Sequence, residues 1–142
     1  MYEEQVGWAV EEGAEFVVAE TLDWFAEASI ALEVIQSHKL PAVVNFLSAS
    51  ERTSARHEYD QACRVLSERG APAVGLNCGH GPATLRPLLT KVIKAVEGKN
   101  NVAALPGNVP HNREGSVFPD VASSQPRSWL PSRAGAVRSY AL

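Results

Sequence analysis

Short apolar runs alternate along the chain with longer stretches in which apolar residues recur at helical spacing. The runs are EFVVAE, AVVNFL, PAVGLNC and NVAALP, which begin at residues 15, 42, 72 and 101. Runs of this length that are rich in β-branched residues are typical of buried strands. The pattern therefore predicts four strands.

The stretches between these runs predict helices, and each carries a start or stop signal. Asp23 occupies an N-cap position, Gly70 ends a periodic stretch, and Pro82 fits a first helical turn because its missing N–H costs nothing there. We expect helices from Tyr2 to Gly13, from Asp23 to near His38, over residues 59–70, and from Pro82 to about Glu97.

Strand and helix follow one another at a spacing of roughly 25 to 31 residues, which is typical of βα units with parallel strands. Each crossover should be right-handed, and parallel strands are usually covered on both faces. The sequence thus predicts an α/β fold with about four parallel strands and their helices.

Beyond Pro106 the alternation stops. The residues that follow contain prolines at 110, 119, 126 and 131 and no sustained helical or alternating period. Such a composition buries too little apolar surface to offset chain entropy. We expect an α/β domain over residues 1–106 and an irregular Pro- and Arg-rich tail over residues 107–142.

Composition narrows the functional classes. The chain has 142 residues, of which 45% are hydrophobic and 20% charged, and a net charge of -3, which favours neither nucleic acid nor a membrane surface. No apolar stretch approaches the ~20 residues of a membrane helix, and the acidic start MYEEQ lacks the basic region of a signal peptide. We expect a cytoplasmic protein whose two cysteines are free thiols or metal ligands.

Polar residues end the predicted strands, where α/β proteins place their functional groups. Glu20 ends the first run, Asn45 lies near the end of the second, and Asn77 and Cys78 end the third. Each has a purely structural alternative. Cys78 could fill the core, Glu20 could favour the following helix N-terminus, and Asn77 could bond the backbone of a turn.

The turn CGHGPAT, which begins at Cys78, offers a different site. Glycines before a helix N-terminus leave amide groups that can hold a phosphate or carboxylate, although the spacing matches neither common phosphate-binding motif. His80 could bind a metal or simply face solvent. Cys63 lies on a helix face that packs on the sheet, and His38, His57 and His111 have no spacing typical of a ligand set.

Four stretches together resemble the homocysteine S-methyltransferase family, including its betaine-homocysteine members. They are EEQVGWAVEEGAEFVVAET, ALEVIQSHKLPAVV, QACRVLSERGAPAVGLNCGHGPATLRPLL and VAALP. The resemblance covers about Tyr2 to Pro106, and GLNC-x-x-GPAT is its most specific part. It implies part of a (β/α)8 TIM barrel, near its fourth to seventh strands.

The resemblance also implies a site. Members of the family transfer a methyl group to homocysteine, giving methionine, and hold zinc with three cysteine thiolates. Cys78 matches the first of these, Glu20 matches the carboxylate that holds the amino group of homocysteine, and Asn77 would orient the turn. The other two thiolates form an adjacent Cys-Cys pair, which this chain lacks. Relatives use betaine, S-methylmethionine or S-adenosylmethionine as the methyl donor.

Two hypotheses follow. In the first, the chain is part of a zinc-dependent methyltransferase domain, with Cys78 as a zinc ligand and Glu20 and Asn77 as substrate contacts. In the second, it is a catalytically inactive fragment or pseudoenzyme that acts as an interaction module and associates through open sheet edges. A barrel with only four strands leaves two such edges unpaired.

Overall fold

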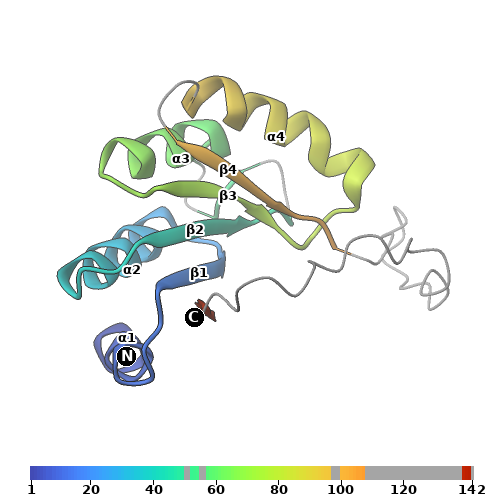
Figure 1. The fold of residues 1–142 in the computed structure, drawn as a ribbon. Helices are drawn as coiled ribbons and strands as arrows, with labels where there is room; N and C mark the ends of the chain where they lie inside the picture. The colour runs from blue at the N-terminus through green and yellow to red at the C-terminus, as the bar shows by residue number, and fades with distance from the viewer. Residues whose placement is uncertain (50–51, 55–56, 97–99, 108–138, 142) are drawn as a thin grey trace, which may run out of the picture.

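The computed structural model describes residues 1–49, 52–54, 57–96, 100–107 and 139–141, and its elements alternate as the sequence predicts. Figure 1 shows a curved parallel sheet with helices packed beside it. The elements are α1 (Tyr2–Glu11), β1 (Phe16–Leu22), α2 (Phe25–Ser37), β2 (Ala42–Leu47), α3 (Tyr59–Glu68), β3 (Ala73–Asn77), α4 (Pro82–Val96), β4 (Asn101–Leu105) and β5 (Ser139–Ala141).

The strand order explains why the helices share one side of the sheet. The order is β4-β3-β2-β1-β5, and every pairing is parallel. Each of the strands β1 to β3 is followed by its immediate neighbour in the same direction. Right-handed crossovers then place α2, α3 and α4 on one face (Figure 1). This is the arrangement of part of a (β/α)8 barrel, as predicted.

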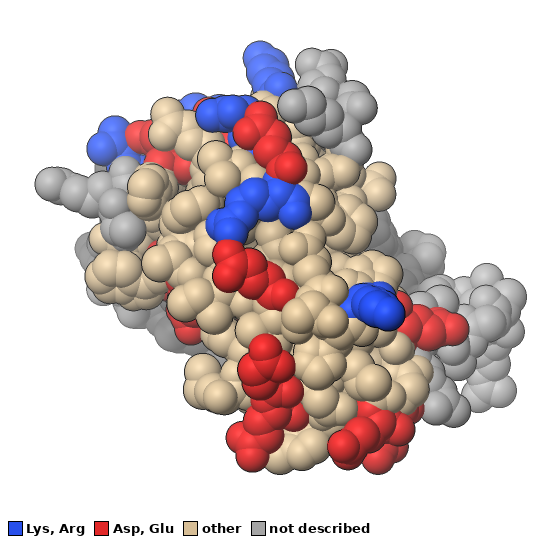
Figure 2. All heavy atoms as spheres, turned by 90° about the vertical axis from the view of Figure 1, so that its left-hand side faces the viewer, with Lys and Arg blue, Asp and Glu red and all other residues tan. Residues whose placement is uncertain are grey.

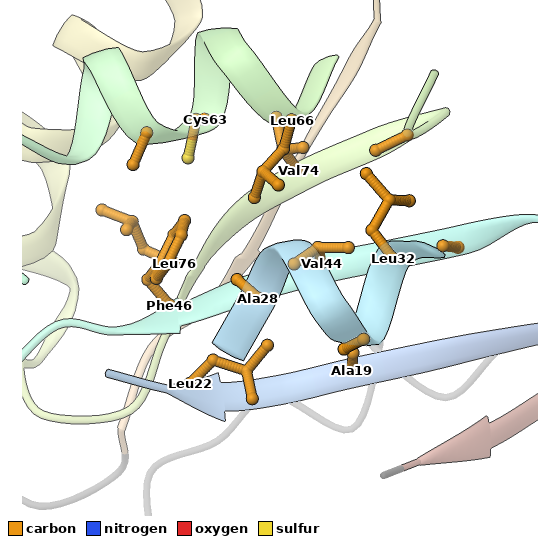
Figure 3. Packing of buried hydrophobic residues seen from close by; sticks show 14 of the residues in the cluster. Ala19, Leu22, Ala28, Leu32, Val44, Phe46, Cys63, Leu66, Val74 and Leu76 are labelled. Carbon is orange, nitrogen blue, oxygen red and sulfur yellow. The ribbon is translucent and has the colours of Figure 1, made fainter. Parts of the chain in front are cut away.

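Alternate residues of the strands pack under these helices. Val44 and Phe46 of β2 and Leu76 of β3 are fully buried against side chains of α2 and α3, as Figure 3 shows. The ring centroids of Phe46 and Tyr59, which begins α3, are 6.2 Å apart. Burial of each large side chain contributes about 1.5–3 kcal/mol. This face therefore carries most of the stabilising contacts.

None of the helices in the described ranges covers the opposite face, which is called the inner face below. Its residues Val18 and Val43 are only half-buried, and Leu105 at the end of β4 is 46% exposed. The expectation that both faces of the sheet are covered remains a prediction for the inner face. The inner face is where a ligand can approach the strand ends.

The predicted helix stop at Gly70 and the predicted N-cap at Asp23 had different outcomes. Gly70 follows α3 with φ +95, as the predicted stop requires. Asp23 is not the N-cap of α2, because that position is occupied by Trp24 and α2 has no side-chain cap. Asp23 instead accepts hydrogen bonds from the Ser54 backbone N–H, 3.2 Å away, and from the Ser54 hydroxyl. It ties the loop after β2 to the end of β1.

α1 lies against α2 at the N-terminal side of the sheet (Figure 1). Val6 and Ala9 are buried, and the Tyr2 hydroxyl donates a 2.9 Å hydrogen bond to Glu27 of α2. Burial, followed by this bond and the charge of Glu27, raises the pKa of Tyr2 to about 12.

β4 approaches β3 so closely that only glycine fits at position 75. A Cβ on Gly75 would lie 1.9 Å from the carbonyl oxygen of Ala103, its partner in β4. The absence of a side chain therefore allows the sheet to curl at this edge.

β5 is an element that the sequence did not predict. Ser139–Ala141 pair in parallel with Phe16–Val18 of β1. Residues 108–138, on which the rest of the predicted irregular tail falls, lie outside the described residues. The division at Pro106 remains a prediction.

Charged side chains are mixed in sign on the side of the molecule where α1 and the N-terminal ends of the strands lie. Figure 2 shows Lys and Arg interleaved with Asp and Glu, with acidic groups gathered at the lower end. Arg64 and Glu68 of α3 form an exposed pair at 3.0 Å, and Arg69 pairs with Glu33. The described part of this face carries no continuous basic patch of the kind that binds nucleic acid.

Candidate functional site

The carboxyl ends of β1, β2 and β3 bring Glu20, Asn45 and Asn77 to the inner face. Ala19 pairs with Val44 and Leu22 with Phe46, so the register shifts and both Glu20 and Thr21 lie opposite Asn45. Ala19 and Leu22 are in the core, and Glu20 therefore points to the inner face. Neighbouring strands lie about 4.8 Å apart, which makes Glu20 and Asn45 adjacent.

Asn77 joins the ends of β1 and β3 across β2. Its Nδ2 donates to the Thr21 hydroxyl at 2.8 Å, and its Oδ1 accepts from the Thr21 backbone N–H at 3.0 Å. The side chain is 1% exposed, so both ends of a buried amide are satisfied. Asn77 thereby fixes the position of β3 relative to the residue that follows Glu20.

Cys78 lies on the turn directly after this amide. Asn77 Nδ2 also lies 3.5 Å from the Cys78 sulfur. The Cys78 backbone has φ +51, its N–H donates to Leu105 at 2.9 Å, and its carbonyl oxygen accepts from the Ser48 hydroxyl. The strained turn is therefore held by β4 on one side and by the end of β2 on the other. Cys78 is exposed and does not pack under a helix.

The turn after Cys78 is closed by glycine. Gly79 has φ +69, and a Cβ there would lie 2.5 Å from the Ser48 backbone. The backbone N–H of His80 donates to the Cys78 carbonyl oxygen at 2.7 Å, so this amide is already used within the turn. That the CGHGPAT turn holds an anion remains a prediction, and the His80 amide is not available as a donor for it.

Cys63 contrasts with Cys78, as the sequence predicts. It is fully buried on α3, with its sulfur 3.9 Å from the Gly75 carbonyl oxygen. Burial, with a smaller contribution from the charge of Asp60, raises the pKa of Cys63 to about 12. A thiol in this state is neither a nucleophile nor a metal ligand.

Asn45 is the residue to which sequence reasoning assigned no role. It is fully buried, and neither its Oδ1 nor its Nδ2 has a hydrogen-bond partner among the described residues. A buried polar group left unpaired costs about 1–3 kcal/mol. A polar residue within the apolar run AVVNFL was the available signal, because such a residue needs a partner.

Of the described histidines, His80 lies on the turn after Cys78, whereas the other two lie elsewhere. His38 lies 2.9 Å from Glu3, at the junction of α1 and α2. His57 packs against Phe25 with ring centroids 5.2 Å apart. His111 falls outside the described residues.

The described ranges contain no group of three or more His, Cys, Asp or Glu side chains that could hold a metal ion. Zinc prefers three or four such donors in proteins. The residues described here therefore do not form a complete zinc site, and Cys78 would contribute one ligand at most.

Comparison with known proteins identifies the family of this chain. The family model described as homocysteine S-methyltransferase matches residues 1–141. The chain belongs to the homocysteine S-methyltransferase family. The match confirms the resemblance and continues beyond Pro106, where the quoted motifs end. No curated protein matches the chain significantly.

Membership of the homocysteine S-methyltransferase family agrees with the architecture. Four parallel strands alternate with helices as in part of a (β/α)8 barrel, and polar groups gather at the carboxyl ends of the strands, where such barrels place their sites. Within the described residues, no helix is both long and apolar enough to cross a membrane.

Proposed function

We propose that the inner face of this sheet binds homocysteine as part of a methyltransferase domain that converts it to methionine. One observation carries the proposal. The Asn77 amide bonds Thr21 and contacts the Cys78 sulfur, so a thiol and the strand that carries Glu20 meet at one edge. This is the edge where a barrel enzyme of the family would hold its substrate.

Glu20 is the proposed contact for the ammonium group of homocysteine. A carboxylate on the partly exposed inner face is complementary to a cation, and a charge-assisted hydrogen bond is stronger than a neutral one. Asn77 is proposed to act at the same site by holding Thr21 and the Cys78 turn in place.

Cys78 is the proposed contribution of this chain to a zinc site. Zinc bound by thiolates can lower the pKa of a substrate thiol when it is present. The further ligands would have to come from beyond the described residues. A free thiol in this role requires a reducing compartment, which supports a cytoplasmic location.

The reaction itself is a methyl transfer to sulfur. The homocysteine thiol gives up its proton to solvent, its sulfur forms a bond to the methyl carbon, the bond between that methyl group and its donor breaks, and the donor keeps the electron pair. Betaine, S-methylmethionine and S-adenosylmethionine are the candidate donors. None of the contacts described above distinguishes among them.

Isothermal titration with L-homocysteine tests the proposal. We expect saturable binding to the wild-type chain and at least tenfold weaker binding to Glu20→Gln, which corresponds to about 1.4 kcal/mol. Glu4→Gln is the matched control, because Glu4 is an exposed carboxylate on α1. Equal affinity of Glu20→Gln and wild type would contradict the role of Glu20.

A second candidate function is non-catalytic association, and it has its own observation. β4 pairs only with β3 among the described strands, and Leu105 at its end is exposed. Unpaired strand edges are templates for other chains. Light scattering would support this function by showing an oligomer without homocysteine binding, and a monomer that binds homocysteine would exclude it.

A further inference from the structure

Asn45 and Asn77 occupy the same face of neighbouring strands but differ in their hydrogen bonding. Asn77 uses both ends of its amide within the protein, whereas both ends of the Asn45 amide are unpaired among the described residues. Asn45 is 0% exposed, so water does not replace the missing partners. Buried amides without partners are rare, and one next to a binding site points to a partner that arrives with the ligand.

The neighbours of Asn45 in β2 show that its side chain points to the inner face. Val44 and Phe46 on either side pack under the helices, which directs Asn45 to the inner face. Glu20 lies opposite it on β1, and Gly75, its partner on β3, has no side chain. In the strand register, Asn45 is therefore the neighbour of the residue whose carboxylate is proposed to bind the ammonium group.

The charges on this face explain why an amide is needed there. An α-amino acid carries a carboxylate next to its ammonium group, and Glu20 alone would repel that carboxylate. The strands β1 to β4 contain no Lys or Arg that could bind it. Asn77 is already engaged with Thr21. Asn45 is the buried amide on these described strands whose N–H groups are unused.

We propose that Asn45 is a substrate-positioning residue that recognises the amino-acid head group of the ligand held by Glu20. Its Nδ2 donates to the ligand carboxylate, and its Oδ1 shares the ammonium with Glu20. The inference rests on the proposed function, since it needs an amino acid at this edge. Because Asn45 has no exposed surface and Glu20 is half-buried, the head group reaches Asn45 only when the side chains that cover it move apart.

Asn45→Leu removes the amide while keeping a similar volume, and Ser29→Ala is the matched control. The Ser29 hydroxyl oxygen is also buried without a partner, but it lies on α2, away from the inner face. Both variants should unfold at temperatures no lower than wild type, because each removes an unpaired polar group. Only Asn45→Leu should lose ligand affinity.

Calorimetric titrations would use L-homocysteine, L-methionine and 3-(methylthio)propylamine, which is methionine without its carboxylate. We expect Asn45→Leu to weaken binding of both amino acids at least about tenfold and to weaken binding of the amine much less. A variant that merely disturbs the fold would weaken all three equally, which would overturn the inference. Should the leucine variant not fold, Asn45→Ser is expected to show the same ligand-selective loss.

The outcomes separate the inference from the proposed function. Unchanged amino-acid binding by Asn45→Leu would overturn the role of Asn45 alone. Binding of methionine but not of homocysteine, with the predicted loss in Asn45→Leu, would support the head-group site and contradict homocysteine as the substrate. Wild-type and Ser29→Ala chains that bind none of the three ligands would contradict both.

Discussion

The two faces of the sheet use alternate residues of the same strands for different purposes. Under the helices, Val44, Phe46 and Leu76 are fully buried among apolar neighbours. On the inner face, Asn45 and Asn77 are equally buried but polar, beside the charged Glu20. The comparison shows that a strand can stabilise the fold with every second residue and leave the others for binding.

The two cysteines follow the same division, and their labelling rates give the largest expected difference. Cys78 is exposed, whereas Cys63 is fully buried and its pKa is raised to about 12. We expect a thiol reagent to label Cys78 at least about 10³-fold faster, because Cys63 reacts only after local or global opening. Cys78→Ser should abolish the fast phase. Fast labelling of both thiols would show that α3 does not protect Cys63 from the reagent.

Truncations on the two faces of β2 should differ in their effect on stability. Phe46→Ala should lower the free energy of unfolding by about 3–5 kcal/mol, because the side chain is fully buried against α3. Leu47→Ala, at the next position and half-buried on the inner face, should cost less than half as much. Urea unfolding measures both. Equal losses would mean that the inner face is as tightly packed as the helical face.

Gly75→Ala tests the close approach of β4. The added Cβ would overlap the Ala103 carbonyl, and we expect a loss of about 1–3 kcal/mol together with faster hydrogen exchange in β4. Gly7→Ala is the control, because nothing lies within 4 Å of that position on α1 and alanine favours a helix. A Gly75→Ala variant as stable as wild type would contradict the close approach of β4 to β3.

The Cys63 thiol, buried on the helix-covered face, should make the protein less stable at alkaline pH. The unfolded Cys63 thiol ionises near its usual value of 9.0, whereas in the folded chain it stays protonated up to about pH 12. Between these values the unfolded state binds fewer protons, so the free energy of unfolding falls by about 1.4 kcal/mol per pH unit. Cys63→Ala should remove this part of the slope and leave that of Tyr2, whose pKa is also raised. An unchanged slope would contradict the burial of Cys63.

Local pattern was enough to predict most of the fold. The run AVVNFL coincides with β2, and Pro82 begins α4 as expected, because strand burial and helix starts leave a signal in neighbouring residues. The cap assigned to Asp23 was wrong because a tertiary contact with Ser54 competes for its carboxylate. β5 was missed because its pairing with β1 joins residues that are more than a hundred positions apart.

The site was predictable in its residue types but not in its bonds. Glu20, Asn77 and Cys78 could be named from their places at strand ends. The bonds between Asn77 and Thr21 span 56 positions and depend on the bulge in β1, which leaves no local signal. The Asn45 amide is likewise unpaired because its described neighbours on other strands offer it no hydrogen-bonding group. Only the folded chain shows this.

The central claim is that the polar residues of the inner face form an amino-acid site, and a titration of the ¹⁵N-labelled chain with L-homocysteine tests it most directly. We predict saturable shifts at the backbone amides of Thr21 and Cys78 and at the Asn45 side chain. The amides of α2 and α3 should stay in place. Shifts spread over the helical layer, or no saturable shift at all, would contradict the claim.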